Sequence, residues 1–287
     1  MNRKIALGTV QFGMDYGINN VRGKIPGDEV LAILDEAWRV GIDMLDTASS
    51  YGNCELVLGE YFKKYSGRFK IVSKLPRGNA SEVKNLPAIS LERLGVERIY
   101  GYLLHNIKSF AEDPAVWEVM VALKKEGKAE KIGFSLYYPN EIDFLLERGI
   151  EFDLVQLPYN VLDRRFENKF QLLKCRGIEI HARSIFLQGI VFKNPEDLPD
   201  YLCRLVGRIG KLQDISKRSG FSVLELCLGF VLAQNAISRV VVGVDRMDHL
   251  KEIITLSSVI EFDSETITEL DDLREDDERL ILPVNWK

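Results

Sequence analysis

Eight short apolar segments recur along the chain and alternate with longer amphipathic stretches. The apolar segments, rich in β-branched residues, are residues 5–9, 42–45, 70–73, 99–104, 131–134, 152–156, 178–181 and 240–242. The stretches between them place apolar residues at helical spacing, for example over residues 28–40 and 114–126. Strands that alternate with helices form parallel sheets, and eight of them favour a closed barrel over an open sheet. The sequence therefore predicts an α/β protein with a (β/α)8 TIM barrel.

No Ser/Gly-rich linker interrupts the alternation, so residues 1–287 are predicted to form one barrel domain. The pattern breaks once, between Arg183 and Arg239, where helical patterns at 202–218 and 223–235 follow a Pro-, Gly- and Asp-rich segment at 187–199. A barrel loop at this position lies over the mouth that the carboxyl ends of the strands form. We therefore expect an extended loop–helix insertion between strands 7 and 8. Residues 263–277 are predicted to form one last acidic helix.

The composition excludes several classes of function. The net charge of −5 leaves no basic surplus for a phosphate backbone, so no nucleic-acid partner is expected. The three histidines and four scattered cysteines have no metal-motif spacing, so no metal site is expected. No apolar run is long enough to span a bilayer, and the N-terminus lacks the pattern of a secretory signal. We expect a cytoplasmic protein with no membrane partner, and the sequence assigns no oligomeric state.

Polar residues follow three successive apolar segments. Asp46, Lys74 and His105 come directly after the second, third and fourth segments, and Tyr51 follows Asp46 in the same loop. Strand ends converge at one mouth of a barrel, so these side chains are expected to share a site. A lysine beside a phenol favours phenolate and lowers the tyrosine pKa, and a tyrosine with such a pKa can exchange a proton with a substrate oxygen. A neutral histidine nearby can orient the same oxygen.

The chain resembles the aldo-keto reductase superfamily in the segment Gly41-Ile-Asp-Met-Leu-Asp46-Thr-Ala-Ser-Ser-Tyr51-Gly52-Asn53-Cys54-Glu55, with Cys54 at a usual serine position. Further matches arrive in family order: Ser73-Lys74, Leu103-Leu104-His105, Gly133-Phe-Ser135 and Val155-Gln156-Leu-Pro-Tyr159-Asn160. The resemblance implies that Tyr51 is the general acid/base, that Lys74 and Asp46 tune it, and that His105 orients the carbonyl. The implied cofactor is a nicotinamide dinucleotide.

The resemblance also implies which residues surround that coenzyme. Ser135 and Gln156 would hold the nicotinamide carboxamide, and Gly8 and Thr9 would lie nearby at the end of the first strand. The backbone of Ser184-Ile-Phe-Leu187-Gln188-Gly189 would form an anion nest over the pyrophosphate. Two positions depart from the family pattern. Leu136 replaces a usual asparagine, and Arg183 replaces a tyrosine that stacks on the nicotinamide ring; a guanidinium can stack but adds charge.

The segment Gly243-Val244-Asp245-Arg246 occupies the place that contacts the adenosine ribose in the family. Arg246 and a helix expected to begin near Met247 suit a 2′-phosphate, whereas the carboxylate of Asp245 suits a ribose hydroxyl. The balance favours NADPH, with NADH as the alternative.

The sequence thus predicts an NAD(P)H-dependent oxidoreductase that reduces a small-molecule aldehyde, ketone or sugar carbonyl, or catalyses the reverse reaction. Tyr137, Tyr138, Phe186 and Phe192 suggest an aromatic pocket wall. One alternative is a catalytically weak relative that binds the nucleotide and acts as a regulatory or redox-sensing subunit. Another is an isomerase or lyase with Lys74 as a Schiff base, which a neighbouring Asp46 disfavours by keeping the lysine protonated.

Overall fold

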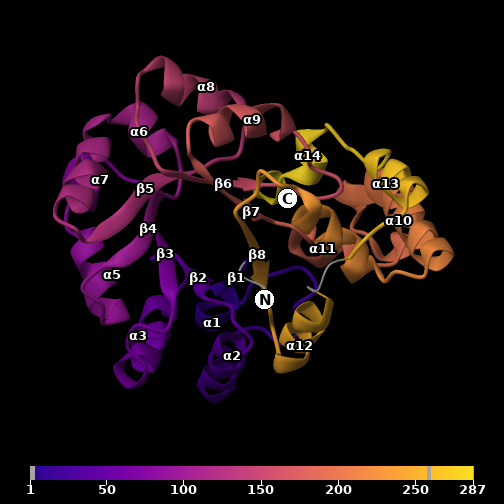
Figure 1. Ribbon diagram of the computed structural model, residues 1–287, viewed down its shortest axis with the longest axis horizontal. Coiled ribbons are helices and arrows are strands. Elements are labelled where there is room, and N and C mark those ends of the chain that lie inside the picture. Colours follow the sequence, from indigo (N-terminus) through magenta and orange to yellow (C-terminus); the bar gives the residue numbers. More distant parts are fainter. Residues whose placement is uncertain (1–3, 257–259, 287) are drawn as a thin grey trace.

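Eight parallel strands close into a barrel in the computed structural model, which describes residues 4–256 and 260–286 (Figure 1). The strands pair in sequence order, and the last pairs with the first. They are β1 (Ile5–Gly8), β2 (Met44–Asp46), β3 (Lys70–Leu75), β4 (Ile99–Leu104), β5 (Ala129–Ser135), β6 (Leu154–Pro158), β7 (Glu179–Arg183) and β8 (Arg239–Gly243). The predicted (β/α)8 barrel is confirmed, with strand boundaries that differ from the predicted ones by one or a few residues.

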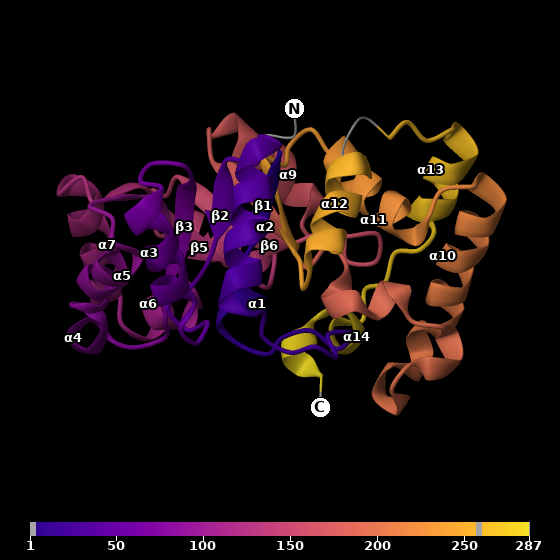
Figure 2. The same ribbon diagram turned by 90° about the horizontal axis from the view of Figure 1, so that it is seen from below.

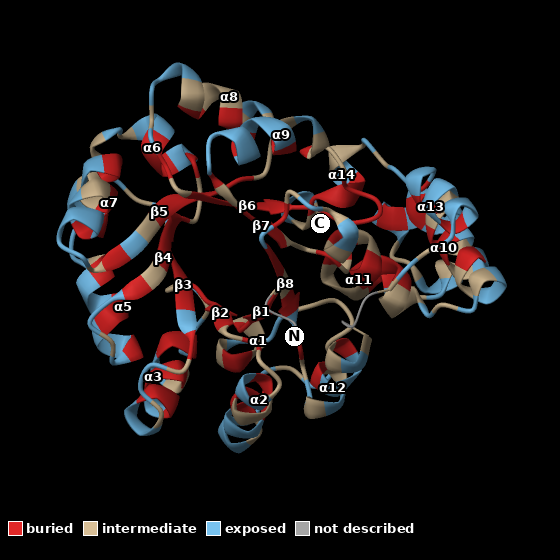
Figure 3. Ribbon diagram, in the orientation of Figure 1, coloured by how far each residue is buried: buried red, intermediate tan, exposed pale blue. Residues whose placement is uncertain are grey.

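Helices pack around the outside of this barrel (Figures 1 and 3). The longer ones that follow the strands are α2 (Gly27–Arg39), α3 (Cys54–Lys64), α5 (Leu86–Leu94), α7 (Ala115–Lys125), α8 (Asn140–Glu147), α9 (Glu167–Cys175), α11 (Val223–Ala233) and α12 (Met247–Leu256). Short helical turns α1 (Val10–Gly13), α4 (Ala80–Val83) and α6 (Lys108–Glu112) lie in the connections. Their buried faces form the main core with the outward side chains of the strands. Within the described residues, no helix has the length and apolarity needed to cross a membrane.

The barrel interior is filled in layers. Its middle is apolar, with Ala6, Met44, Val72, Leu103 and Leu154 packed together. The amino-terminal end holds polar contacts: Glu179 accepts hydrogen bonds from Tyr100 and Lys131, and Arg239 pairs with Asp43 at 2.7 Å. These contacts are separate from the carboxyl end of the strands, where barrel active sites lie.

The interval between β7 and β8 contains the predicted insertion. It consists of the 3₁₀ turns η1 (Leu187–Phe192), η2 (Pro195–Asp197) and η3 (Asp200–Leu205), then α10 (Val206–Ser219) and α11. A second apolar cluster lies beneath it, in which α10 and α11 pack with α13 (Ser264–Asp271) and α14 (Glu278–Ile281). Helix α1 directly follows β1 and so lies at the carboxyl ends of the strands. Figure 2 shows α14 at the same end of the barrel.

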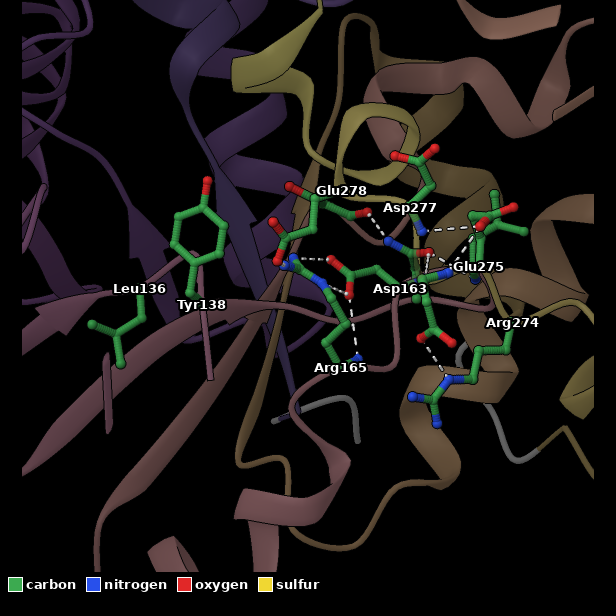
Figure 4. Close-up of polar contacts among 12 residues, drawn as sticks. Leu136, Tyr138, Asp163, Arg165, Arg274, Glu275, Asp277 and Glu278 are labelled. Atoms are coloured by element: carbon green, nitrogen blue, oxygen red, sulfur yellow. Dashed lines mark hydrogen bonds and ion pairs between the residues drawn. The ribbon is translucent and has the colours of Figure 1, made fainter. Parts of the chain in front are cut away.

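The predicted acidic helix over residues 263–277 is wrong in its extent, because α13 ends at Asp271. Glu275 N–H donates to the carbonyl of Leu162 at 2.9 Å and so leaves helical geometry. Arg165 then connects the loop after β6 to α14, through Asp163 at 2.9 Å and Glu278 at 2.8 Å (Figure 4). The final 3₁₀ turn, η4 (Pro283–Asn285), follows α14. The tail is thus bound to the loop after β6.

Candidate active site

A cavity of about 800 Å³ opens at the carboxyl end of the barrel. Its wall includes Asp46, Tyr51 and His105 from the predicted catalytic group. It also includes all but one of the predicted coenzyme residues: Gly8, Thr9, Ser135, Gln156, Arg183, Ser184, Gln188, Gly189, Gly243, Asp245 and Arg246. The structure therefore gathers residues from seven strand ends around one space. The described part of the chain contains no cluster of three or more His, Cys, Asp or Glu side chains suited to a metal ion.

Lys74 and Asp46 form a buried ion pair beside this cavity. The ammonium Nζ donates to both carboxylate oxygens of Asp46, at 2.9 and 2.6 Å, and to the carbonyl of Thr47 at 2.9 Å. Gln156 Nε2 donates to the same carboxylate at 2.6 Å. Burial lowers the pKa of Lys74, while the charge of Asp46 opposes that shift. With all three N–H bonds engaged, Lys74 offers no lone pair for a Schiff base.

The loop that presents Tyr51 depends on a glycine. Gly52 has a φ of +57°, and a Cβ there would lie 2.4 Å from the carbonyl oxygen of Gly13. A side chain at this position would therefore push the loop away from α1. With glycine in place, the Tyr51 ring lies 5.2 Å from Lys74 Nζ and edge-on to His105 at 5.8 Å between ring centroids.

The predicted lowering of the Tyr51 pKa is wrong for this structure. Burial raises the pKa of the Tyr51 hydroxyl well above its ordinary value of 10.0, and the charge of Asp46 raises it further. Arg183 opposes this rise. The physical reason is that Lys74 donates its hydrogen bonds to Asp46 and Thr47 and none to the phenol, so the burial of Tyr51 and the charge of Asp46 outweigh the attraction between the ammonium and a phenolate. Tyr51 is consequently held as a neutral phenol, which is the form that donates a proton.

His105 is held neutral as well. Burial lowers its pKa to about 3, and the positive charges of Lys74 and Arg183 contribute to the shift. Its Nδ1 lies 3.2 Å from the hydroxyl of Ser50. A neutral imidazole has one N–H and one acceptor nitrogen, so it can donate to a carbonyl oxygen without competing as an acid. This confirms the neutral state expected for His105.

These two pKa shifts predict a flat pH profile. His105 is neutral above about pH 3 and Tyr51 stays protonated past its ordinary pKa, so neither group changes charge near neutrality. We expect kcat/KM for carbonyl reduction to vary less than about threefold between roughly pH 5 and 8, measured at saturating coenzyme. A His105→Gln variant should be slower but equally flat. A break near pH 6.5, the ordinary histidine value, would contradict this expectation.

The residues predicted to hold the carboxamide, Ser135 and Gln156, differ in their contacts from Thr9 at the end of the first strand. Ser135 is buried at the cavity wall, opposite Gln156 in the β5–β6 register. Thr9 donates its hydroxyl to the carbonyl of Asp46 at 2.9 Å, and Cys54 Sγ lies 3.2 Å from that hydroxyl. Thr9 and Cys54 thus connect β1, β2 and α3, while Ser135 and Gln156 remain at the cavity.

The loop after β7 has an unusual backbone. Ser184, Leu187 and Gln188 have φ values of 59°, 46° and 54°, which non-glycine residues seldom adopt, and Gly189 follows at 89°. Such conformations cost of order 1–3 kcal/mol each and cluster at binding sites. The prediction that Leu187 contacts the coenzyme is wrong. Its side chain is buried in the second apolar cluster, and its N–H donates to the carbonyl of Ser184 at 3.0 Å. It therefore presents neither side chain nor N–H to the cavity.

Residues of the loop after β1 also line the cavity and were not predicted. Asn19 Nδ2 donates to the carbonyl of Gly189 at 2.6 Å, and Gln188 Nε2 donates to the hydroxyl of Tyr16 at 3.2 Å. Arg22 donates to the carbonyl of Asp245 at 3.2 Å. The loop after β1 thus bridges to the loops after β7 and β8. The available signal was its length, because a long aperiodic segment after a barrel strand lies at the mouth.

The end of the cavity formed by β8 and α12 carries the predicted ribose-binding segment. Helix α12 begins at Met247, as expected, and Arg246 is exposed at the cavity just before it. The carboxylate of Asp245, two residues before this helix, lies 2.7 Å from Nδ1 of His249 in its first turn. Arg246 is therefore placed to meet an anionic group at the helix N-terminus.

One observation at the cavity wall fits a nucleotide coenzyme. The side-chain oxygen of Gln11 is buried at the wall with no hydrogen-bond partner in the described part of the chain, so it is available to a ligand donor. Two glycines allow the side chains of this wall to pack closely. A Cβ on Gly243 would lie 3.2 Å from that same oxygen, and a Cβ on Gly189 would lie 3.0 Å from Asn19.

Comparison with known proteins places this geometry in a family. The model of the Aldo/keto reductase family matches residues 4–275. The oxidoreductase YqkF of Bacillus subtilis is 26% identical, covering 93% of this chain and 95% of the relative. The L-galactose dehydrogenase of Arabidopsis thaliana is 25% identical, covering 98% and 95%. A solved aldo-keto reductase from Bacillus halodurans, in its holo form, superposes with a TM-score of 0.76 at 22% identity, covering 95% of this chain and 92% of that one, and supports the fold.

Proposed function

The chain belongs to the aldo/keto reductase family and is an NAD(P)H-dependent oxidoreductase, and we propose that Tyr51 is the proton donor with which it reduces a carbonyl group. The observation that carries the proposal is the meeting of Tyr51, His105 and the Asp46–Lys74 pair at one cavity. A neutral phenol and a neutral imidazole side by side suit the reduction of an uncharged carbonyl.

In this mechanism Ser135 and Gln156 would hold the carboxamide of the nicotinamide, and the coenzyme, when bound, would supply the hydride that the carbonyl carbon needs. His105 donates a hydrogen bond to the carbonyl oxygen and orients it. Tyr51 gives its proton to that oxygen as negative charge develops there, which leaves an alcohol and a phenolate. The Lys74 ammonium, 5.2 Å from the Tyr51 ring, stabilises the phenolate until solvent returns a proton. The reverse sequence oxidises the alcohol.

The cavity wall favours an aldehyde, ketone or sugar as substrate. Tyr137, Phe186 and Phe192 line the cavity, and Phe186 contacts Phe192 at 5.2 Å between ring centroids. Tyr138, predicted with them, is not part of the wall; the guanidinium of Arg165 lies 5.8 Å from its ring centroid. The unpredicted Tyr16 adds a hydroxyl that a sugar can bond. A sugar also agrees with the named activity of the L-galactose dehydrogenase relative.

A screen for oxidation of NADPH and NADH tests the proposed function. The purified chain is incubated with aldehydes, keto-sugars and nucleotide sugars, and loss of reduced coenzyme is followed by absorbance. Turnover with at least one carbonyl class supports the proposal. Coenzyme binding without turnover on any class would instead favour the regulatory or redox-sensing relative.

We propose NADPH as the preferred coenzyme because Arg246 is exposed at the cavity and forms no ion pair among the described residues, whereas the carboxylate of Asp245 lies 2.7 Å from His249 Nδ1. Arg246→Ala should raise the KM for NADPH about tenfold and leave that for NADH nearly unchanged, since it removes one charge-assisted contact to the 2′-phosphate. Lys251→Ala, on the exposed face of the same helix, is the matched control. Equal losses with both coenzymes would show that Arg246 does not discriminate between them.

A further inference from the structure

Arg183, at the end of β7, is held in place by neutral groups. Its Nη2 donates to the carbonyl of Leu136 at 3.0 Å and its Nη1 to the hydroxyl of Ser184 at 3.3 Å. The ring of Tyr137 covers the guanidinium, with 4.3 Å between Cζ and the ring centroid. Among residues 4–256 and 260–286, Arg183 forms no ion pair, although it lines the cavity. Its position is therefore fixed by neutral groups.

Two acids whose pKa the charge of Arg183 affects have hydrogen-bond partners of their own. Both oxygens of Asp163 bind Arg165, each at 2.9 Å (Figure 4). Glu141 accepts two backbone N–H groups of its own loop, at 2.7 and 2.9 Å. Burial raises the pKa of both acids, and the charge of Arg183 opposes the rise through space without contact. Asp46 is paired with Lys74, so among the described residues no acid contacts Arg183, which brings a positive charge to the cavity.

This charge lies where a nicotinamide would be held. Leu136, whose carbonyl binds Arg183, follows Ser135 directly, and Arg183 pairs with Pro158 two positions after Gln156 in the β6–β7 register. The guanidinium therefore lies beside the carboxyl ends of β5 and β6. Ser135 and Gln156 are the two residues assigned to the carboxamide, so a ring anchored by them lies next to the guanidinium.

We propose that Arg183 makes the site discriminate between the two redox states of the nicotinamide, binding the neutral reduced ring more tightly than the cationic oxidised ring. The inference rests on the proposed function, because it requires the coenzyme to occupy this cavity. Two positive charges in near contact repel one another, and the repulsion is strong where the protein excludes water. The stacking attraction of the guanidinium plane acts on both ring states, whereas the repulsion acts on the oxidised ring only.

The experiment is a set of calorimetric titrations of the full chain with NADPH and with NADP⁺, and with NADH and NAD⁺. In the parent we expect the oxidised form to bind with a Kd about tenfold higher than the reduced form. Arg183→Gln, which keeps a planar hydrogen-bond donor without charge, should bring the ratio near one, mainly by tightening the oxidised form. Arg183→Lys keeps the charge and should keep most of the ratio.

Arg246→Gln is the matched control, because it removes a cation at the opposite end of the coenzyme and should weaken NADPH and NADP⁺ equally. Equal affinities for both redox forms in the parent would overturn the inference, as would a parent-like ratio in Arg183→Gln. Failure of the parent to bind any of the four coenzymes would overturn the proposed function itself, and the discrimination with it. The two failures are therefore distinguishable.

Discussion

Tyr51→Phe should lower kcat/KM for carbonyl reduction by about a hundredfold to ten-thousandfold, the range expected when a positioned general acid is lost. The variant keeps the ring that packs edge-on to His105 and removes only the hydroxyl. Coenzyme affinity should stay within about twofold of the parent, because Tyr51 is not among the groups assigned to the carboxamide or the pyrophosphate. Steady-state kinetics with the best carbonyl substrate, together with calorimetric coenzyme titration, measure both quantities.

Tyr137→Phe is the matched control, since it also deletes a phenolic hydroxyl at the same cavity while the ring that stacks on Arg183 remains. This control should lose far less rate than Tyr51→Phe. A Tyr51→Phe enzyme with the parent's rate would show that another group donates the proton.

Lys74→Met should lose both activity and stability. Removing the ammonium leaves the carboxylate of Asp46, which is 4% exposed, with Gln156 as a neutral partner and no cation. Loss of one member of a buried pair costs about 3–5 kcal/mol in unfolding free energy. The uncompensated charge of Asp46 also holds the Tyr51 proton more strongly, so reduction should slow by at least about tenfold. Denaturant unfolding and steady-state kinetics check the two effects.

The double variant Asp46→Asn/Lys74→Met separates the two effects. It contains no buried charge at this point, so most of the lost stability should return, whereas the rate should not, because no cation remains to stabilise the phenolate. If Lys74→Met alone unfolds at the denaturant concentration of the parent, the ion pair is not important for stability.

The sequence predicts the barrel well because the spacing of apolar residues in strands and helices can be read from neighbouring residues alone, without tertiary information. Asp46, Lys74 and His105 were placed correctly for a related reason: each directly follows an apolar segment, and barrel closure alone brings such ends together. Arg183 was likewise placed at the cavity. These predictions needed only the order of the segments.

Predictions that depended on which atoms meet were less accurate. The sign of the Tyr51 pKa shift depends on where the three Lys74 protons point, and sequence cannot show that they point at Asp46 and Thr47. Leu187 belongs to a loop that faces the cavity, but its side chain packs into the second core. Asn19 takes part in the site through a contact with Gly189, which is 170 residues away in the sequence, and no local sequence pattern predicts such a contact.

The hydrogen bonds between the loop after β1 and the loop after β7 bear on coenzyme release as well as on structure. Asn19 donates to the carbonyl of Gly189 and Gln188 donates to the hydroxyl of Tyr16, and all four residues line the cavity. A dinucleotide bound under these contacts would have to break both of them to leave, whereas a small alcohol would not. We therefore expect separation of the two loops to limit the rate at which oxidised coenzyme is released. The expected kinetic signature is a burst of product in the first catalytic cycle followed by a slower steady rate.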